Sequence, residues 1–226
     1  MTAKSVKRNY QKELEHIIEG LSDSKSRPSL LLHACCGPCS SYVLEYLASF
    51  FDITIFYYNP NIYPKEEYER RLTELKNLLP RFPIAFKNNV KLVEQNYDPN
   101  DFYNAIDISH HPEFAEEKEK GERCRRCYEF RLKKAYEYAL LHNFEYFCTT
   151  LSISPFKDAE KINEIGSLLS AINVDSSKQN PKWLFSDFKK NNGFKRSLEL
   201  SKEYDLYRQQ YCGCVFSKKN TIHKDI

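Results

Sequence analysis

The chain alternates short apolar segments with longer segments in which apolar residues recur at helical spacing. Residues 29–34, Ser-Leu-Leu-Leu-His-Ala, form an almost continuous apolar run, which is typical of a strand buried in a parallel sheet. Three later segments have the same character and predict further strands. The predicted strands are 29–34, 53–58, 91–96 and 144–149, and the predicted helices are 42–50, 65–79, 117–141 and 158–172. Ser40 and Ser41 are expected to cap the first of these helices.

Strands that alternate with helices predict an α/β domain built around a mainly parallel, Rossmann-like sheet. In such sheets, ligands bind beyond the carboxyl ends of the strands. The loop at 35–39 follows the first strand, and the loop at 149–155 begins where the fourth strand ends. Both loops are therefore expected at the active-site edge. The tail at 183–214 is expected to be mostly helical.

Residues 1–28 differ from the rest of the chain. Leu14, Ile17, Ile18 and Leu21 follow helical spacing and predict one amphipathic helix, and 22–28 has the character of a linker. We therefore divide the chain into an N-terminal helical extension with its linker, residues 1–28, and a single α/β catalytic domain, residues 29–226.

Composition limits the class of protein. Hydrophobic residues make up 41% and charged residues 29%, as in ordinary globular proteins. No run approaches the ~18 apolar residues of a membrane span, and the first twenty residues lack the apolar centre of a secretory signal. A cytoplasmic protein without a membrane partner is therefore expected. Because thiols stay reduced in that compartment, clustered cysteines indicate metal binding or catalysis.

Seven of the eight cysteines fall in three clusters, which are Cys35-Cys36-Gly37-Pro38-Cys39, Cys124-Arg125-Arg126-Cys127 and Cys212-Gly213-Cys214. A cubane iron–sulfur cluster needs four thiolates. Cys124 and Cys127 are three residues apart on a predicted helix, so they share one face. Cys35 and Cys36 are neighbours at a strand-to-loop turn and can both face one centre. These two pairs predict the four ligands of a [4Fe-4S] cluster.

Two other uses of the same cysteines stay open. The spacings of Cys36 to Cys39 and of Cys124 to Cys127 also occur in zinc knuckles, although here the pairs lie much farther apart in the chain than usual. The tetrapeptide Cys36-Gly-Pro-Cys39 at a strand-to-helix junction also suits a thioredoxin-like dithiol, but that interpretation leaves the other clustered cysteines unexplained.

The pair Cys212 and Cys214 has a different character. One intervening residue permits Cα separations that overlap the disulfide range, and a small strained ring would be easily reduced and therefore suited to catalysis. The alternative is two more metal ligands. Cys39 is then left over, either at a second metal ion, an iron, or as an ordinary thiol. Cys148 lies inside a predicted strand and is expected to be core.

The net charge of +3 is too small to indicate a partner, but the basic residues are grouped. The two groups are Arg123, Arg125, Arg126, Arg131, Lys133 and Lys134, and then Lys189, Lys190, Lys195 and Arg196. Such groups are commonly solvated faces. Together with an aromatic content of 14%, they also suit single-stranded RNA. Single-stranded RNA is therefore a candidate partner.

Five segments together resemble a known family, the cobalamin-independent epoxyqueuosine reductases of bacterial queuosine biosynthesis. The segments are LLLHACCGPCSSYVLEYL, YNPNIYPKEEYERRL, GERCRRCYEFRLKKAYEYA, TTLSISPFKDAEKINEIG and FSDFKKNNGFKRSLELSKEYDLYRQQYCGCVFS. The resemblance runs from about residue 30 to residue 217. It implies an oxidoreductase that reduces the epoxide of epoxyqueuosine at the tRNA wobble position to give queuosine, with a separate electron donor.

The resemblance also implies a fold like the nucleotide-binding domains of ATP pyrophosphatases, of the nucleotide-alpha-hydrolase kind, with a helical C-terminal region. By the family's pattern, Cys35, Cys36, Cys124 and Cys127 hold a [4Fe-4S] cluster, and Cys212 with Cys214 is the redox-active pair. The first loop carries cysteines where ATP pyrophosphatases carry a glycine-rich phosphate loop, so no ATP is expected. The alternatives are a metal-stabilised tRNA-binding module without turnover and a thiol–disulfide oxidoreductase.

Overall fold

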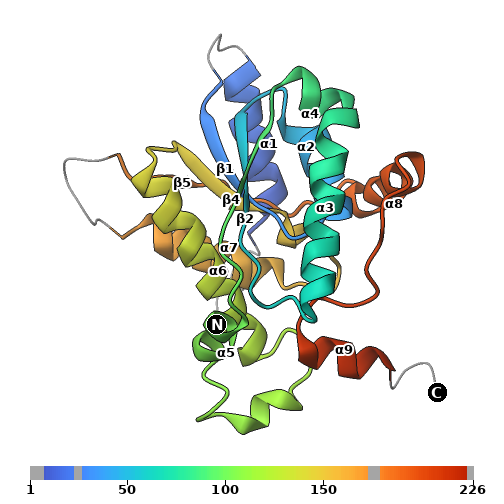
Figure 1. Ribbon diagram of the computed structural model, residues 1–226. Coiled ribbons are helices and arrows are strands. Elements are labelled where there is room, and N and C mark those ends of the chain that lie inside the picture. Colours follow the sequence, from blue (N-terminus) through green and yellow to red (C-terminus); the bar gives the residue numbers. More distant parts are fainter. Residues whose placement is uncertain (1–7, 23–26, 173–178, 223–226) are drawn as a thin grey trace, which may run out of the picture.

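A computed structural model describes residues 8–22, 27–172 and 179–222. Its centre is one sheet of five parallel strands in the order β3-β2-β1-β4-β5 (Figure 1). The strands are β1 (Ser29–His33), β2 (Asp52–Tyr57), β3 (Lys91–Glu94), β4 (Tyr146–Thr149) and β5 (Lys182–Trp183). The predicted α/β class with a parallel sheet is confirmed. Two-residue β5 was not predicted.

The apolar run at residue 29 forms the central strand. Leu31 of β1 pairs with Thr54 on one side and with Phe147 on the other. Leu30, Leu31 and Leu32 are all fully buried. A central strand covered by helices on both faces loses the alternation of apolar and polar residues, which explains the continuous run.

Helices cover both faces of the sheet (Figure 1). They are α1 (Tyr10–Ser22), α2 (Gly37–Leu47), α3 (Lys65–Arg81), α4 (Pro83–Lys87), α5 (Pro99–Ile106), α6 (Glu122–Leu141), α7 (Ala159–Ser170), α8 (Gly193–Glu203) and α9 (Val215–Ile222). Helices α6 and α7 pack together on one face, and α2, α3, α4 and α8 lie on the other. Short 3₁₀ segments lie between α5 and α6, at η1 (Pro112–Ala115), and between β4 and α7, at η2 (Thr150–Ile153). No helix of the described residues is both long and apolar enough to cross a bilayer.

The start of α2 differs from the prediction. The N-cap is Cys36, whose sulfur accepts a hydrogen bond from the Cys39 amide. Ser40 and Ser41 lie inside the helix, and their hydroxyls donate to the carbonyls of Cys36 and Pro38. The predicted serine caps are therefore wrong. A proline in the first turn suits a helix that begins at this point, because its fixed φ is already helical.

The long helix α6 begins at Glu122 rather than at residue 117. The Glu117 carboxylate instead accepts hydrogen bonds from the amides of Glu122 and Arg123, both at 2.7 Å. It therefore satisfies two amides that the first turn of a helix leaves without a partner. The C-terminal region carries α8 and α9, but the prediction that 183–214 is mostly helical is wrong, because α8 is its only helix and 184–192 and 204–214 are irregular.

The first helix belongs to the same core as the sheet. Leu14 of α1 is fully buried there, and Gln11 donates to the Tyr46 hydroxyl of α2 at 3.2 Å. The predicted amphipathic helix is confirmed. The division of the chain at residue 28 stays a prediction, and residues 23–26 of the predicted linker lie outside the described part.

Candidate metal centre and redox site

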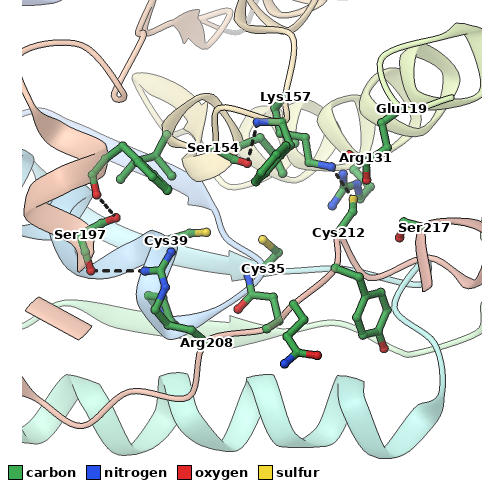
Figure 2. Close-up of a pocket in the computed structure, with 18 of the residues that line it drawn as sticks. Cys35, Cys39, Glu119, Arg131, Ser154, Lys157, Ser197, Arg208, Cys212 and Ser217 are labelled. Atoms are coloured by element: carbon green, nitrogen blue, oxygen red, sulfur yellow. Dashed lines mark hydrogen bonds between the residues drawn. The ribbon is translucent and has the colours of Figure 1, made fainter. Parts of the chain in front are cut away.

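A cavity of about 690 Å³ lies beyond the carboxyl ends of β1 and β4 (Figure 2). Both predicted loops reach it, through Cys35 and Cys39 after β1 and through Leu151 and Ile153 after β4. The segment that precedes α9 forms another side of the cavity, and Cys212 of this segment lies in the cavity wall. Its charged lining residues are Lys118, Arg131, Lys157 and Arg208 with Glu116 and Glu119. The predicted position of the active-site edge is thus matched by a large cavity that contains thiols.

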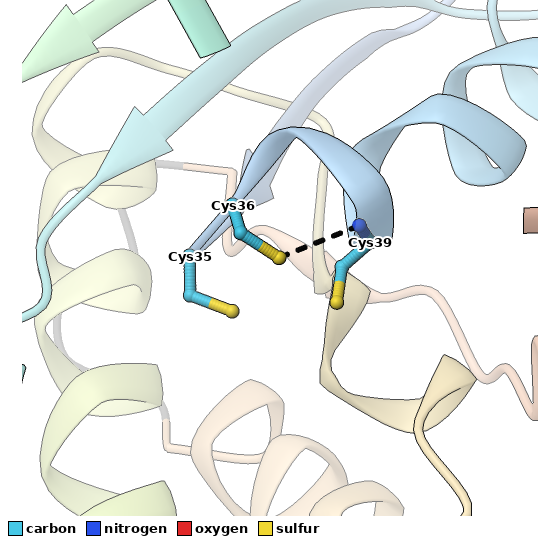
Figure 3. Close-up of side chains that lie close together, drawn as sticks. All are labelled: Cys35, Cys36 and Cys39. Carbon is cyan, nitrogen blue, oxygen red and sulfur yellow. Dashed lines mark hydrogen bonds between the residues drawn. The ribbon is translucent and has the colours of Figure 1, made fainter. Parts of the chain in front are cut away.

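Three cysteines of the first loop lie together (Figure 3). The sulfur atoms of Cys35, Cys36 and Cys39 all lie within 4.8 Å of one another. Among the His, Cys, Asp and Glu side chains of the described residues, these three form the group whose ligand atoms lie close enough together to share a metal ion. Cys35 and Cys36 are buried, and Cys39 is partly buried. Cys39 therefore lies beside Cys35 and Cys36, the pair that is predicted to bind the cluster.

The environment of these thiols favours a negative charge on one of them. Hydrogen bonds from the Cys36 and Cys39 thiols, together with the positive charges of Arg131 and Arg71, lower the pKa of Cys35. Burial and the hydrogen bond to Cys35 raise the pKa of Cys36 to about 12. The N-terminus of α2 also favours a thiolate, because its free amides carry partial positive charge. The hydrogen bonds with Cys35 and Cys36 also raise the pKa of Cys39, so the loop offers one thiolate beside two thiols, which a metal ion would have to deprotonate on binding.

The second predicted pair lies on the first turns of α6. Cys124 and Cys127 are both buried, but neither is part of the group within 4.8 Å. Burial raises the pKa of both thiols, that of Cys127 to about 12. Cys127 packs in the same small apolar cluster as Cys214, so the α6 pair lies beside the segment that carries Cys212 and Cys214. Their joint assignment with Cys35 and Cys36 to one cluster stays a prediction.

The backbone around Cys212 is held in place by buried contacts. Arg71 of α3 donates to the Cys212 carbonyl at 3.1 Å and to the Glu67 carboxylate at 2.7 Å. The Gly213 carbonyl accepts from the Tyr63 amide at 2.8 Å, and Gly213 has a φ of 134°. This conformation is accessible to glycine and strained for other residues. The glycine between the two cysteines therefore permits the turn that directs Cys212 into the cavity.

A buried lysine contacts the cysteine sulfur. Lys157 lies in the loop between η2 and α7, and its ammonium donates to Cys212 Sγ (Figure 2). Its side chain is 7% exposed. On the other side of the pair, the Ser217 amide donates to Cys214 Sγ at 3.4 Å.

Arg131 of α6 brings a second positive charge to the cavity. It is 2% exposed and donates to Asn59 Oδ1 at 3.3 Å and to the Cys127 carbonyl at 3.4 Å. Its Nη2 has no hydrogen-bond partner within the described part of the chain. Burial and the neighbouring Arg131 charge lower the pKa of His33 to about 3. A buried guanidinium with a free donor, beside a neutral imidazole, suits an anionic group.

These residues fit an iron–sulfur centre. Five buried or partly buried thiols of Cys35, Cys36, Cys39, Cys124 and Cys127 supply more than the four ligands a cubane needs. The free N–H of Arg131 and the buried Arg71 supply positive charge for a cluster whose thiolate ligands make it negative. Hydrogen bonds to the sulfurs of such clusters help to set their reduction potential.

Comparison with known proteins identifies the family. Residues 30–220 match the family model described as epoxyqueuosine reductase QueH. The chain belongs to the QueH family. It is 41% identical over 212 residues to "Epoxyqueuosine reductase QueH" of Streptococcus pyogenes serotype M1, which covers 93% of this chain and 78% of the relative. It is 40% identical to the Staphylococcus aureus (strain Mu50) protein of that name, over 95% of this chain and 85% of the relative. It is 33% identical to the Thermotoga maritima protein of that name, over 84% of this chain and 90% of the relative.

For this QueH family member, the predicted basic groups are less available than their sequence positions imply. Arg123 and Arg131 are buried. Arg125 donates to the carboxylates of Glu122 and Glu129, and Lys189 pairs with Asp187. A surface for RNA phosphates therefore cannot include the buried pair. Carboxylates partly neutralise the charge of five others, which are Arg125, Arg126, Lys134, Lys189 and Arg196.

The cavity carries residues that the sequence analysis of this QueH family member did not single out. Lys157 and Phe156 both lie in the loop after β4, and Phe156 is 65% exposed at the cavity lining. Arg71, 141 residues from Cys212, positions the backbone of that cysteine. The signal for Lys157 and Phe156 was their place beyond the carboxyl end of a predicted strand. Nothing local to Arg71 indicates its long-range contact.

Proposed function

We propose that this chain reduces the epoxide of epoxyqueuosine, a modified guanine at the wobble position of certain tRNAs, to give queuosine. Membership of the QueH family over residues 30–220 is the observation that carries the proposal. The thiol-lined cavity at the carboxyl ends of β1 and β4 supports it, because that is where an α/β fold of this kind binds its substrate.

For the metal centre, we propose that Cys35, Cys36, Cys124 and Cys127 bind a [4Fe-4S] cluster and that the enzyme needs no cobalamin. The close approach of Cys39 to Cys35 and Cys36 supports a second iron that shares this loop. When bound, these groups supply single electrons and a Lewis acid for the epoxide oxygen. Cys35 and Cys39 line the cavity, so a metal centre in this loop and a substrate in the cavity would be neighbours.

The second redox element is the pair Cys212 and Cys214. Removal of an epoxide oxygen as water consumes two electrons and two protons. Closure of two thiols to a disulfide releases two electrons and two protons, so one dithiol matches one turnover. An external electron donor then returns the disulfide to the dithiol, which suits the reducing conditions of the cytoplasm. Cys212 lies in the cavity wall, where it can act on a bound substrate.

The cavity also has the features needed to hold a nucleotide. Phe156 exposes most of its ring, as a stacking surface for a base requires. Arg208 and Lys118 supply positive charge for phosphates on the same lining. Bases in an anticodon loop are single-stranded, and proteins recognise such bases largely by stacking and edge contacts. We therefore propose that the wobble nucleotide enters the cavity past Phe156.

The direct test uses anaerobically purified protein, a chemical reductant and tRNA that carries epoxyqueuosine. Nucleosides from the digested tRNA are measured by liquid chromatography and mass spectrometry. The proposal predicts loss of one oxygen atom to give queuosine. Tight binding of the tRNA without conversion, by protein with its full iron content, would instead identify a metal-stabilised RNA-binding module. Reduction of general disulfide substrates without conversion would identify a thiol–disulfide oxidoreductase.

A further inference from the structure

A buried positive charge lies against the proposed redox thiol. Lys157 is 7% exposed, and its ammonium donates to Cys212 Sγ. Its backbone is fixed as well, because its amide donates to the Ser154 carbonyl at 3.1 Å (Figure 2). A lysine that only increased solubility would extend into solvent, so its burial against a sulfur in the cavity needs another reason.

We infer that Lys157 is the proton donor to the epoxide oxygen, and that oxidation of Cys212 causes Lys157 to release this proton. The inference rests on the proposed function of Cys212 and Cys214 as the working dithiol. Both Lys157 and Cys212 line the cavity into which the epoxide would be placed. A donor that touches the oxidised sulfur is also within reach of the oxygen that departs beside it.

The step balances in atoms and electrons. The step starts from Lys157 as an ammonium, from Cys212 reacting as the thiolate, which is the reactive form of a cysteine, and from Cys214 as a thiol. The sulfur–sulfur bond forms, and two electrons pass to the substrate, where both carbon–oxygen bonds of the epoxide break and a carbon–carbon double bond forms. The oxygen leaves as water, with one proton from Lys157 and one from the Cys214 thiol. Lys157 remains as a neutral amine and recovers its proton from solvent.

The surroundings of Lys157 explain why proton release would follow oxidation. Burial lowers the pKa of Lys157, but interaction with Cys212 outweighs burial and holds this pKa well above its usual value, and Tyr128 and Cys124 of α6 add to the effect. A disulfide carries no charge. Once Cys212 is oxidised, its contribution disappears and burial remains. The other charged groups of α6 and of the segment before it that line the cavity are unchanged by this step; they are Arg131, Glu116, Lys118 and Glu119.

Single-turnover assays of reduced protein with epoxyqueuosine-containing tRNA test the inference. Lys157→Ala is expected to convert at least about 100-fold more slowly than wild type, since a general acid typically contributes at least that much. Methylammonium ions should restore part of the rate, whereas tetramethylammonium, which carries charge but no proton, should not. Lys161→Met is the control, because Lys161 is a lysine of α7 whose ammonium donates to the Lys120 carbonyl and does not line the cavity.

Lys157→Arg gives an independent check if the alanine variant folds poorly. Arginine keeps the charge and can donate to Cys212, but it does not give up its proton. The inference predicts that this variant stays slow with wild-type iron content. Wild-type rates in Lys157→Arg or Lys157→Ala, equal rescue by both ammonium ions, or no rescue of a folded alanine variant would overturn it. Failure of the wild-type protein to convert the tRNA would count against the proposed function instead.

Discussion

The side-chain amide of Gln209 donates a hydrogen bond to the sulfur of Cys36 at 3.1 Å. The two residues are 173 positions apart in the chain. Gln209 lies in the non-helical segment before Cys212, and Cys36 caps α2 after the first strand. This bond therefore joins the segment of the proposed dithiol to the loop of the proposed metal centre. Groups from opposite ends of the sequence meet at one edge of the sheet.

Removal of this hydrogen bond should make the metal centre harder to reduce. A hydrogen bond to a ligand sulfur stabilises the more negative, reduced form of an iron–sulfur cluster. Gln209→Leu should therefore lower the midpoint potential, measured by a redox titration followed in visible absorption. Gln210→Leu is the matched control, since Gln210 also lines the cavity but is exposed. Equal potentials in wild type and Gln209→Leu would show that Cys36 is not a cluster ligand.

The assignment of the α6 cysteines predicts a difference between two buried thiols. Cys124→Ala should lose bound iron and visible absorption, because the cluster loses one of four ligands. Cys148→Ala should keep both, since Cys148 is a fully buried residue of β4 whose thiol has no role in the proposed site. Iron analysis of the two anaerobically purified variants makes the comparison. Full iron content in Cys124→Ala would remove that residue from the cluster.

Much of the fold could be predicted because the signals are local. The apolar run at 29–34 and the alternation of strands with helices gave the parallel sheet, and the strand ends gave the active-site edge. The start of α2 was misplaced because Ser40 and Ser41 resemble caps in sequence, whereas the cap is the sulfur of Cys36. The start of α6 was misplaced because Glu117 continues the helical pattern but binds the helix end from outside.

The rest of the site depends on contacts between distant segments, which a single sequence does not specify. The bond from Gln209 to Cys36 and that from Arg71 to Cys212 each join residues more than a hundred positions apart. The approach of Cys39 to its neighbours depends on the turn of α2, which was predicted to begin later. The burial of Lys157 is likewise a result of packing, because nothing in Ser-Pro-Phe-Lys distinguishes it from a surface loop.

The exposed ring of Phe156 should contribute to tRNA binding. Stacking on a base is worth about 1–3 kcal/mol, so Phe156→Ala should weaken binding roughly 5- to 150-fold. The effect should appear mainly as a higher KM for tRNA, with kcat changed much less. Phe86→Ala is the control, because Phe86 of α4 is 73% exposed and does not line the cavity. Equal KM values for the two variants would show that Phe156 does not contact the RNA.

The packing of β5 against α7 can be tested separately from function. A β-carbon at Gly166 would lie 2.1 Å from Cδ2 of Trp183, so Gly166→Ala should displace the indole. Overpacking of this kind costs about 1–3 kcal/mol. A β-carbon at Gly20 would meet no heavy atom within 4 Å. Gly20→Ala should therefore leave the free energy of unfolding unchanged or raise it by up to about 1 kcal/mol. Urea denaturation measures both free energies of unfolding. A neutral Gly166→Ala variant would mean that β5 is not packed as described.

The Cys214→Ser variant tests the central claim most directly, namely that Cys212 and Cys214 supply the two electrons while other cysteines hold the metal. One anaerobic preparation is assayed both for iron and for conversion of epoxyqueuosine-containing tRNA. The account predicts wild-type iron, an unchanged visible spectrum and no conversion, because a single thiol cannot close the disulfide. Depleted iron would place Cys214 in the metal site, and conversion at the wild-type rate would remove the dithiol from the reaction; either result would contradict the account.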